Sequence, residues 1–146
     1  MNFVRVAIAA AAAWVVSIPV GYVVNEILLK DIYVANAGAL RSEAAIQAGL
    51  PLGFVFMLVG FFVFAYAYAK GYEGGNGTME GLRFGVIVAL FVICFAHVWT
   101  YVVFPITGSM GMALMIDGIL ESALYGAIVG SVYKPAEKPA RRAATV

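Results

Sequence analysis

Charge is scarce in this chain, and its scarcity argues against the common soluble classes. Only 12% of the 146 residues are charged and 64% are hydrophobic, whereas ordinary globular domains are about a quarter charged and about half apolar. A mean hydropathy of +0.96 leaves too little polar surface to cover a soluble fold. The net charge of +1 lacks the basic surplus of nucleic-acid-binding proteins, so no nucleic-acid partner is expected.

Cysteine and histidine are almost missing, since Cys94 and His97 are the only ones. A single cysteine forms no internal disulfide, and no CxxC pair exists to bind zinc or to serve a redox reaction. A metal or a haem would have to use His97 together with ligands of other kinds. We therefore predict no cofactor and no metal site, with His97 left as the single candidate ligand.

Long apolar runs are abundant instead. A bilayer core about 30 Å thick needs about 20 apolar residues in a helix. Four windows reach this length: residues 3–29, 51–69, 82–104 and 110–133. The sequence therefore predicts an all-α protein whose partner is the lipid bilayer. We expect a four-helix transmembrane bundle in one domain, residues 1–134, followed by a disordered cytoplasmic tail, residues 135–146.

The segment between the first two windows is the longest connection. It contains Ser42 followed by EAAIQA. Serine is a favoured residue just before a helix, because its side-chain oxygen accepts a free backbone N–H there. The pattern predicts a short capped helix that lies on the outer membrane surface.

Basic residues predict the orientation, because Lys and Arg collect on the cytoplasmic side of a membrane. If both termini lie inside, the inner segments carry Arg5, Lys70, Arg83 and the basic residues of the tail. The outer segments then carry only Lys30 and Arg41. We therefore predict an N-in, C-in topology.

The most polar internal stretch is KGYEGGNGTMEGLRFG, residues 70–85. It lacks the glycine-lysine-serine/threonine order of a phosphate-binding loop and the G-x-G-x-x-G spacing of a dinucleotide site. Glycine supplies positive φ in tight turns. We therefore predict a reversal between two helices. Thr78 should cap the helix that follows the turn, the third of the four, and Glu80 should lie close to that helix's positive N-terminal end.

Four motifs stand together in the second half of the chain: AKGYEG, EGLRFG, YVVFPI and a glutamate-bearing helix that ends in GSVYKP. Over roughly residues 60–135 they resemble a family of small four-span bacterial membrane proteins that has no assigned activity. The matching positions are Gly71, Tyr72, Glu73, Gly74, Glu80, Gly81, Arg83, Pro105, Glu121, Tyr133, Lys134 and Pro135. The resemblance implies a four-helix fold in the bacterial inner (cytoplasmic) membrane and supplies no mechanism.

Small residues recur every four positions in two windows, which places them on one helix face. The first window holds Ala9, Ala13, Ser17, Gly21 and Asn25, and the fourth holds Gly118, Ser122, Gly126 and Gly130. Small residues let membrane helices approach closely. We expect these two ridges to pack against each other or against a second copy of the chain.

Four ionisable residues lie at membrane depth, where charge is costly and usually faces the bundle interior. They are Glu26, His97, Asp117 and Glu121. We expect them to meet in the outer half of the bundle, with Glu121 within one side chain or one water of His97. Three interpretations stay open: a hydrogen-bonded structural cluster, a proton or cation pathway that uses Glu121, and a metal, haem or pigment ligand at His97.

The small-residue ridges favour a non-enzymatic protein, and no nucleophile–base pair with motif support predicts a catalytic residue. The leading hypothesis is an accessory or scaffold subunit that packs against other membrane helices, as a homo-oligomer or in a larger complex. The alternative is a small proton- or cation-coupled transporter that acts as a dimer, and a third is a His97-ligated haem or pigment subunit. A water-reachable Glu121 favours transport, whereas a dry Glu121 bonded to His97 favours the scaffold.

Overall fold

The computed structural model describes residues 1–133, and these residues are helical with no strand among them. Four of their helices are long and apolar enough to cross a membrane: Phe3–Leu28, Glu43–Gly71, Gly77–Val103 and Gly108–Val132. The predicted all-α class and the four spans are confirmed, and the helices define a multi-pass membrane protein. The tail predicted for residues 135–146 lies outside the described residues.

The first span changes its helical form along its length. It begins as α1 (Phe3–Tyr22) and continues as a π-helix, η1 (Val23–Leu28). The side chain of Asn2 caps α1. After η1 the chain forms a short helix, α2 (Lys30–Ala35), and a 3-10 turn, η2 (Ala37–Ala39). These two short elements make the segment between the first two spans.

The second span, α3 (Glu43–Gly71), is the longest helix. Ser42 caps it, since the Ser42 hydroxyl accepts the N–H of Ala45 at 3.4 Å. The separate surface helix predicted after Ser42 is therefore wrong, because the helix that starts there runs without a break into the membrane span. Pro51 lies inside α3, and its missing N–H removes one helical hydrogen bond without ending the helix.

The third span also contains a π-helix. It consists of α4 (Gly77–Val92), η3 (Ile93–His97) and α5 (Val98–Val103). Asn76 rather than Thr78 caps α4, because its side-chain oxygen accepts the N–H of Met79 at 3.2 Å. The cap predicted at Thr78 is thus wrong by two residues, since the helix begins earlier than its apolar run.

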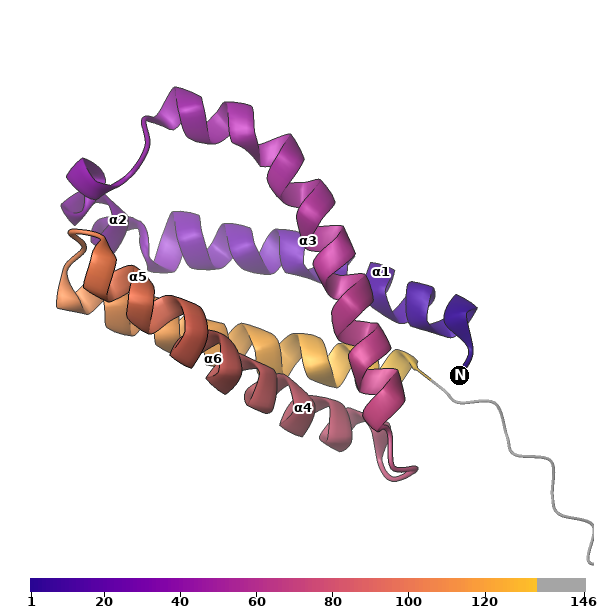
Figure 1. Ribbon diagram of the computed structural model, residues 1–146. Coiled ribbons are helices and arrows are strands. Elements are labelled where there is room, and N and C mark those ends of the chain that lie inside the picture. Colours follow the sequence, from indigo (N-terminus) through magenta and orange to yellow (C-terminus); the bar gives the residue numbers. More distant parts are fainter. Residues whose placement is uncertain (134–146) are drawn as a thin grey trace, which may run out of the picture.

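The fourth span, α6 (Gly108–Val132), lies at the centre of the helix packing. Figure 1 shows α4 running alongside α6, α1 on another side of α6, and α3 crossing the bundle with its first half standing away. The N-terminus and the end of α6 lie at one end of the bundle, which we call the terminal end. The opposite end carries α2, and we call it the α2 end.

The core lies where α1, α3 and α6 meet, toward the terminal end. Its buried residues are Val6, Ala9, Ala10, Ala13, Phe61, Ala65, Tyr68, Tyr125, Val129 and Tyr133. The small residues of α1 allow close contact with α3, and the Trp14 indole donates to the carbonyl of Phe54 at 3.2 Å. Ala9, Ala13 and Ser17 of the first small-residue ridge are therefore buried within the chain, whereas Asn25 is exposed.

The second ridge packs against α4. Glycines of α4 and α6 face each other along the contact between the two helices. A side-chain carbon added to Gly77, Gly81 or Gly85 would strike a backbone carbonyl of α6. The same holds in reverse for Gly126 and Gly130. The α6 ridge thus meets a row of small residues on α4, which sequence analysis did not identify as a ridge, rather than the α1 ridge or a second copy.

The glycine-rich stretch forms the predicted reversal between α3 and α4. Gly74 has a φ of 99°, the one positive φ among the described residues. The Glu80 carboxylate accepts the N–H of Glu73 at 3.2 Å and that of Gly75 at 2.5 Å. The Tyr72 hydroxyl donates to the Gly75 carbonyl at 3.0 Å. These N–H groups, the Gly75 carbonyl and the Glu80 carboxylate are therefore bonded within the turn itself.

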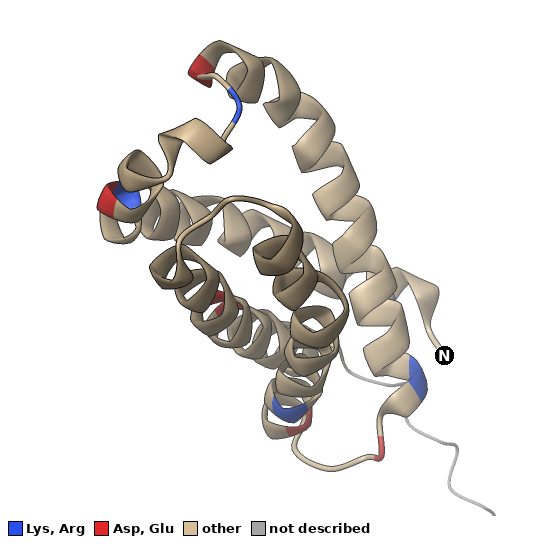
Figure 2. Cartoon of the chain, turned by 60° about the vertical axis from the view of Figure 1, so that its left-hand side comes forward, with Lys and Arg blue, Asp and Glu red and all other residues tan. Residues whose placement is uncertain are grey.

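Charged residues gather at the two ends of the bundle, as Figure 2 shows. Between the ends, one helix carries acidic residues about midway. Asp117 and Glu121 are the acidic residues of α6, and both lie within its membrane-spanning length. This distribution fits a membrane-spanning bundle with one polar position at depth.

Candidate functional site

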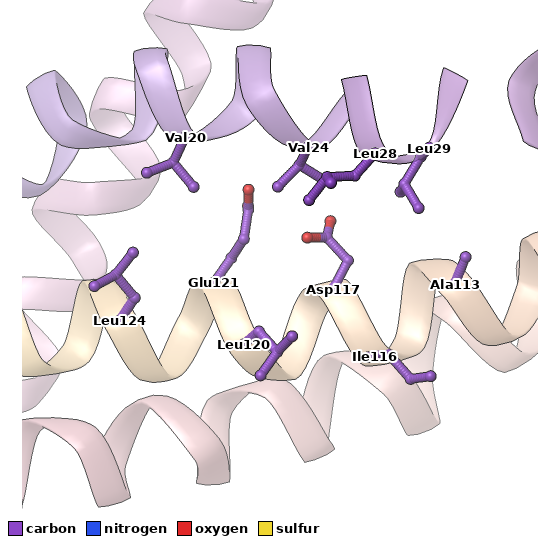
Figure 3. Close-up of a pocket in the computed structure, with 10 residues that line it drawn as sticks. All are labelled: Val20, Val24, Leu28, Leu29, Ala113, Ile116, Asp117, Leu120, Glu121 and Leu124. Carbon is purple, nitrogen blue, oxygen red and sulfur yellow. The ribbon is translucent and has the colours of Figure 1, made fainter. Parts of the chain in front are cut away.

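A pocket of about 370 Å³ lies between the first span and α6. Its lining is formed by Val20, Val24, Leu28, Leu29, Ala113, Ile116, Asp117, Leu120, Glu121 and Leu124. Figure 3 shows the two carboxylates reaching from α6 toward Val20, Val24 and Leu28 on the facing helix. The only polar side chains of this lining are therefore two acids.

The spacing of the two acids explains their shared direction. Asp117 and Glu121 are four residues apart in α6, so they lie one above the other on one helix face. The pocket lining of the described chain contains no Lys and no Arg. Two ionised carboxylates in apolar surroundings repel each other and lose their hydration. A proton or another cation is needed to relieve this cost.

Glu121 is also tied to the core. Tyr125 follows one turn later in α6, and its hydroxyl interacts with the Glu121 carboxylate. The Tyr125 ring is buried and meets the ring of Phe61 on α3 edge-on, with 5.1 Å between the centroids. Glu121 is thereby held at the boundary between the pocket and the packed core.

His97 lies near the acids but outside the pocket. It is the last residue of η3, and its ring packs against Gly118, where an added side-chain carbon would come within 3.1 Å of His97 Cε1. Its Nδ1 atom is buried without a hydrogen-bond partner among the described residues. The imidazole interacts electrostatically with Asp117. The structure therefore brings His97 close to Asp117 and does not bring it into the pocket with Glu121.

Glu26 is not brought together with the other three residues. It lies in η1, its side chain is exposed, and it is not part of the pocket lining. Its neighbours Val24 and Leu28 line the pocket instead. A π-helix bonds each residue to the fifth rather than the fourth along the chain, so Glu26 takes a different face from the one that a regular α-helix would give it.

Tyr33 and Asn25 are polar residues near the pocket that sequence analysis did not identify as part of the site. The Tyr33 hydroxyl donates to the Asn25 side-chain oxygen at 2.7 Å, and the Asn25 amide donates to the Gly21 carbonyl at 2.7 Å. Burial raises the pKa of the Tyr33 phenol, and the carboxylates of Asp117 and Glu121 raise it further. Tyr33 therefore stands in the electrostatic field of both acids. The signal in the sequence that could have placed Tyr33 near the acids was the run KDIYVA, which forms the short helix α2.

Two π-helices flank the acidic part of α6. Val24 and Leu28 of η1 face it across the pocket, and His97 of η3 packs against it beside Gly118. Single π-helical turns inside α-helices occur often at functional sites. Their presence at the acids is a second feature, independent of charge, that marks this part of the bundle.

The described residues contain no group of three or more His, Cys, Asp and Glu side chains that could hold a metal ion. No family model, no curated protein and no solved structure matches this chain. The interpretation of the site therefore depends on the geometry of its own residues.

Proposed function

We propose that this chain is a small membrane transporter that binds a proton or another monovalent cation at Asp117 and Glu121. The observation that supports this proposal is the pair of carboxylates in an apolar pocket whose lining includes no Lys or Arg. An acidic residue inside a membrane usually pairs with a charge of the protein or belongs to an ion pathway. The lining has no Lys or Arg to pair with the acids, and His97, which interacts with Asp117, lies outside the pocket; this arrangement favours the second role.

The two acids also provide a way to couple two cations. Their carboxylates repel each other when both are ionised, so one bound positive charge lowers the free energy of the pair. A proton and a second cation then compete for the same pair. Competition of this kind makes the uptake of one depend on the release of the other.

The proposed transporter works as a homodimer in the bacterial inner membrane, with both termini in the cytoplasm. One wall of the pocket faces outward from the bundle, toward lipid in a membrane, since Ile116 and Leu120 are 53% and 65% exposed. A second copy over this wall would enclose the pathway that four spans leave open. No catalytic activity is proposed.

An accessory subunit is the second candidate. Its original support was the pair of small-residue ridges, and these pack within the chain. What favours it now is the first part of α3, residues 43–60, in which every residue except Met57 is exposed. A larger membrane complex would use this surface. A pull-down from native membranes in mild detergent tests it, since a stoichiometric partner supports the accessory role.

The transport proposal is tested with the purified chain in liposomes that enclose a pH-sensitive dye. We expect an outward proton flux when sodium, potassium or tetraphenylphosphonium is added outside, because the added cation displaces protons from the acidic pair. Glu121→Gln keeps the shape of the side chain and removes its ionisation, so it should lower the flux at least tenfold.

Glu26→Gln is the matched control, because it makes the same chemical change in an exposed residue outside the pocket. This variant should keep the wild-type flux. Equal fluxes through wild type and Glu121→Gln, for all three cations, would show that the pocket is not a coupling site.

A further inference from the structure

The short helix α2 lies next to the pocket at the α2 end of the bundle. Leu29, the residue before α2, is part of the pocket lining. Helix α2 contacts both η1 and α6, the two elements that form the pocket walls. Its Tyr33 is half-buried and lies in the electrostatic field of Asp117 and Glu121. Helix α2 therefore lies beside the pocket at the end of the bundle where the first span and α6 reach the membrane surface.

Two sets of hydrogen bonds hold α2 in place. Asn36, just after α2, is buried, and its side-chain oxygen accepts the N–H of Thr107 at 2.7 Å. The Asn36 amide also donates to the Thr107 hydroxyl at 3.1 Å. Thr107 is the cap of α6. At the other side, Tyr33 donates to Asn25 at 2.7 Å. A few polar contacts thus fasten a helix of only six residues.

The chain on either side of α2 is suited to movement. It is preceded by the π-helix η1 and followed by the 3-10 turn η2. Stretches of 3-10 helix can mark hinges, and single π-helical turns occur often at functional sites. No residue of α2 is fully buried, so lifting it exposes little apolar core. The polar contacts at Asn36 and Tyr33 are then the main barrier to opening.

We propose that α2 is a cover over the carboxylate pocket, and that the pocket exchanges its proton or cation with the adjacent aqueous phase only when this cover opens. The inference rests on the proposed function, because it assigns the access route to the same acidic pair. Tyr33 and Asn36 act as positioning residues that keep the cover closed. Opening must break the contacts of Asn36 with Thr107 and of Tyr33 with Asn25.

The test locks the cover with a disulfide. Cysteines replace Asn36 and Thr107 in a Cys94→Ser background, since Cys94 is exposed and would react as well. The hydrogen bonds between Asn36 and Thr107 bring the two positions together, and the mass of the oxidised protein checks that the disulfide has formed. The full chain in detergent is oxidised with diamide and then treated with a water-soluble carbodiimide, which modifies reachable carboxyl groups.

The readout is specific for the pocket. Trypsin does not cleave before Pro135 or Pro139, so the peptide that holds the pocket acids runs from residue 84 to residue 141 and also contains Glu137. With Glu137→Gln added to the Cys94→Ser background, Asp117 and Glu121 are its only acidic residues, and its mass gain reports on them alone. We expect the oxidised protein to be modified at least tenfold more slowly than the reduced protein. The membrane-soluble dicyclohexylcarbodiimide, which arrives through the lipid or detergent phase, should modify both forms at similar rates. Each single cysteine variant is a control that cannot form the internal disulfide.

The outcomes separate the two proposals. Equal modification of the oxidised and reduced proteins by the water-soluble reagent would overturn the cover and leave the acidic site intact. If neither reagent modifies peptide 84–141 in the reduced protein, the acids are unreachable, and both the proposed function and the cover are wrong.

A second variant keeps the test valid if the cysteine pair does not fold. Tyr33→Phe removes the hydrogen bond to Asn25 and keeps the ring. It should raise the rate of water-soluble modification severalfold, because the cover opens more often. Tyr22→Phe, at an exposed position of α1, is the matched control and should leave the rate unchanged. An unchanged rate in Tyr33→Phe would count against the role of Tyr33 in closing the cover.

Discussion

Gly81 and Gly126 leave no room for a side-chain carbon on either residue. A carbon added to one would strike the carbonyl oxygen of the other. Glycine costs about 1 kcal/mol relative to alanine inside a helix, and the close backbone approach offsets this cost through van der Waals contact. The contact between α4 and α6 therefore depends on the absence of side chains at these positions.

The first prediction concerns this contact. Gly126→Ala should lower the free energy of unfolding by about 1–3 kcal/mol, which is the usual cost of overpacking. The reason is that the opposing atoms belong to the backbone and cannot rotate away. Thermal unfolding in detergent measures the effect.

Gly53→Ala is the control for helix propensity, because no atom lies within 4 Å of a carbon added there. It should leave the midpoint unchanged or raise it. If Gly126→Ala and Gly53→Ala behaved alike, the α4–α6 contact would not be limited by side-chain volume.

The second prediction concerns the turn between α3 and α4. Glu80→Ala removes the acceptor for the N–H groups of Glu73 and Gly75. Those two amides should then exchange their hydrogens at least several times faster, as measured by hydrogen–deuterium exchange. The turn is exposed, so the unfolding midpoint should change little. Glu43→Ala, at the first turn of α3, is the matched control and should not affect the turn. If the two amides exchanged as slowly in Glu80→Ala as in the wild type, the Glu80 carboxylate would not hold the turn.

The third prediction concerns orientation. In a Cys94→Ser background, a cysteine at Gly75 should react with a membrane-impermeant maleimide only after the cytoplasmic side is opened. A cysteine at Ala39 should react in intact cells. The reason is the excess of Lys and Arg in the segments predicted to be cytoplasmic. The opposite pattern would invert the topology.

The fourth prediction concerns the titration of Tyr33. Its pKa is raised from the ordinary value of 10.0 by burial and by the two nearby carboxylates. Below pH 10 the phenol is neutral in both the folded and the unfolded chain, so it does not affect stability. As the pH rises above 10, the unfolded chain loses this proton first, and stability falls.

Ultraviolet difference titration checks that the pKa of Tyr33 is raised. The absorbance change lost in Tyr33→Phe should have its midpoint above pH 10. In the double variant Asp117→Asn/Glu121→Gln the midpoint should move down, because two of the causes are removed. A midpoint that stays the same in the double variant would show that Tyr33 does not stand in the field of the acids.

The apolar windows alone determined the all-helical class and the four spans, because twenty consecutive apolar residues meet a condition that is local in the chain. The same is true of the reversal at Gly74, where turn chemistry is a property of a few neighbouring residues. The pairing of Asp117 with Glu121 on one face also followed from spacing alone, because α6 is a regular α-helix around them.

The tertiary structure decided which ridge meets which, because any row of small residues fits any other and the sequence does not choose between them. It placed Gly126 against Gly81 and the α1 ridge against α3. It also separated Glu26 from the pocket, since the π-helix at Val23–Leu28 changes the helical period. The position of Tyr33 beside the acids depends on a helix of six residues, too short to be stable without its contacts to η1 and α6.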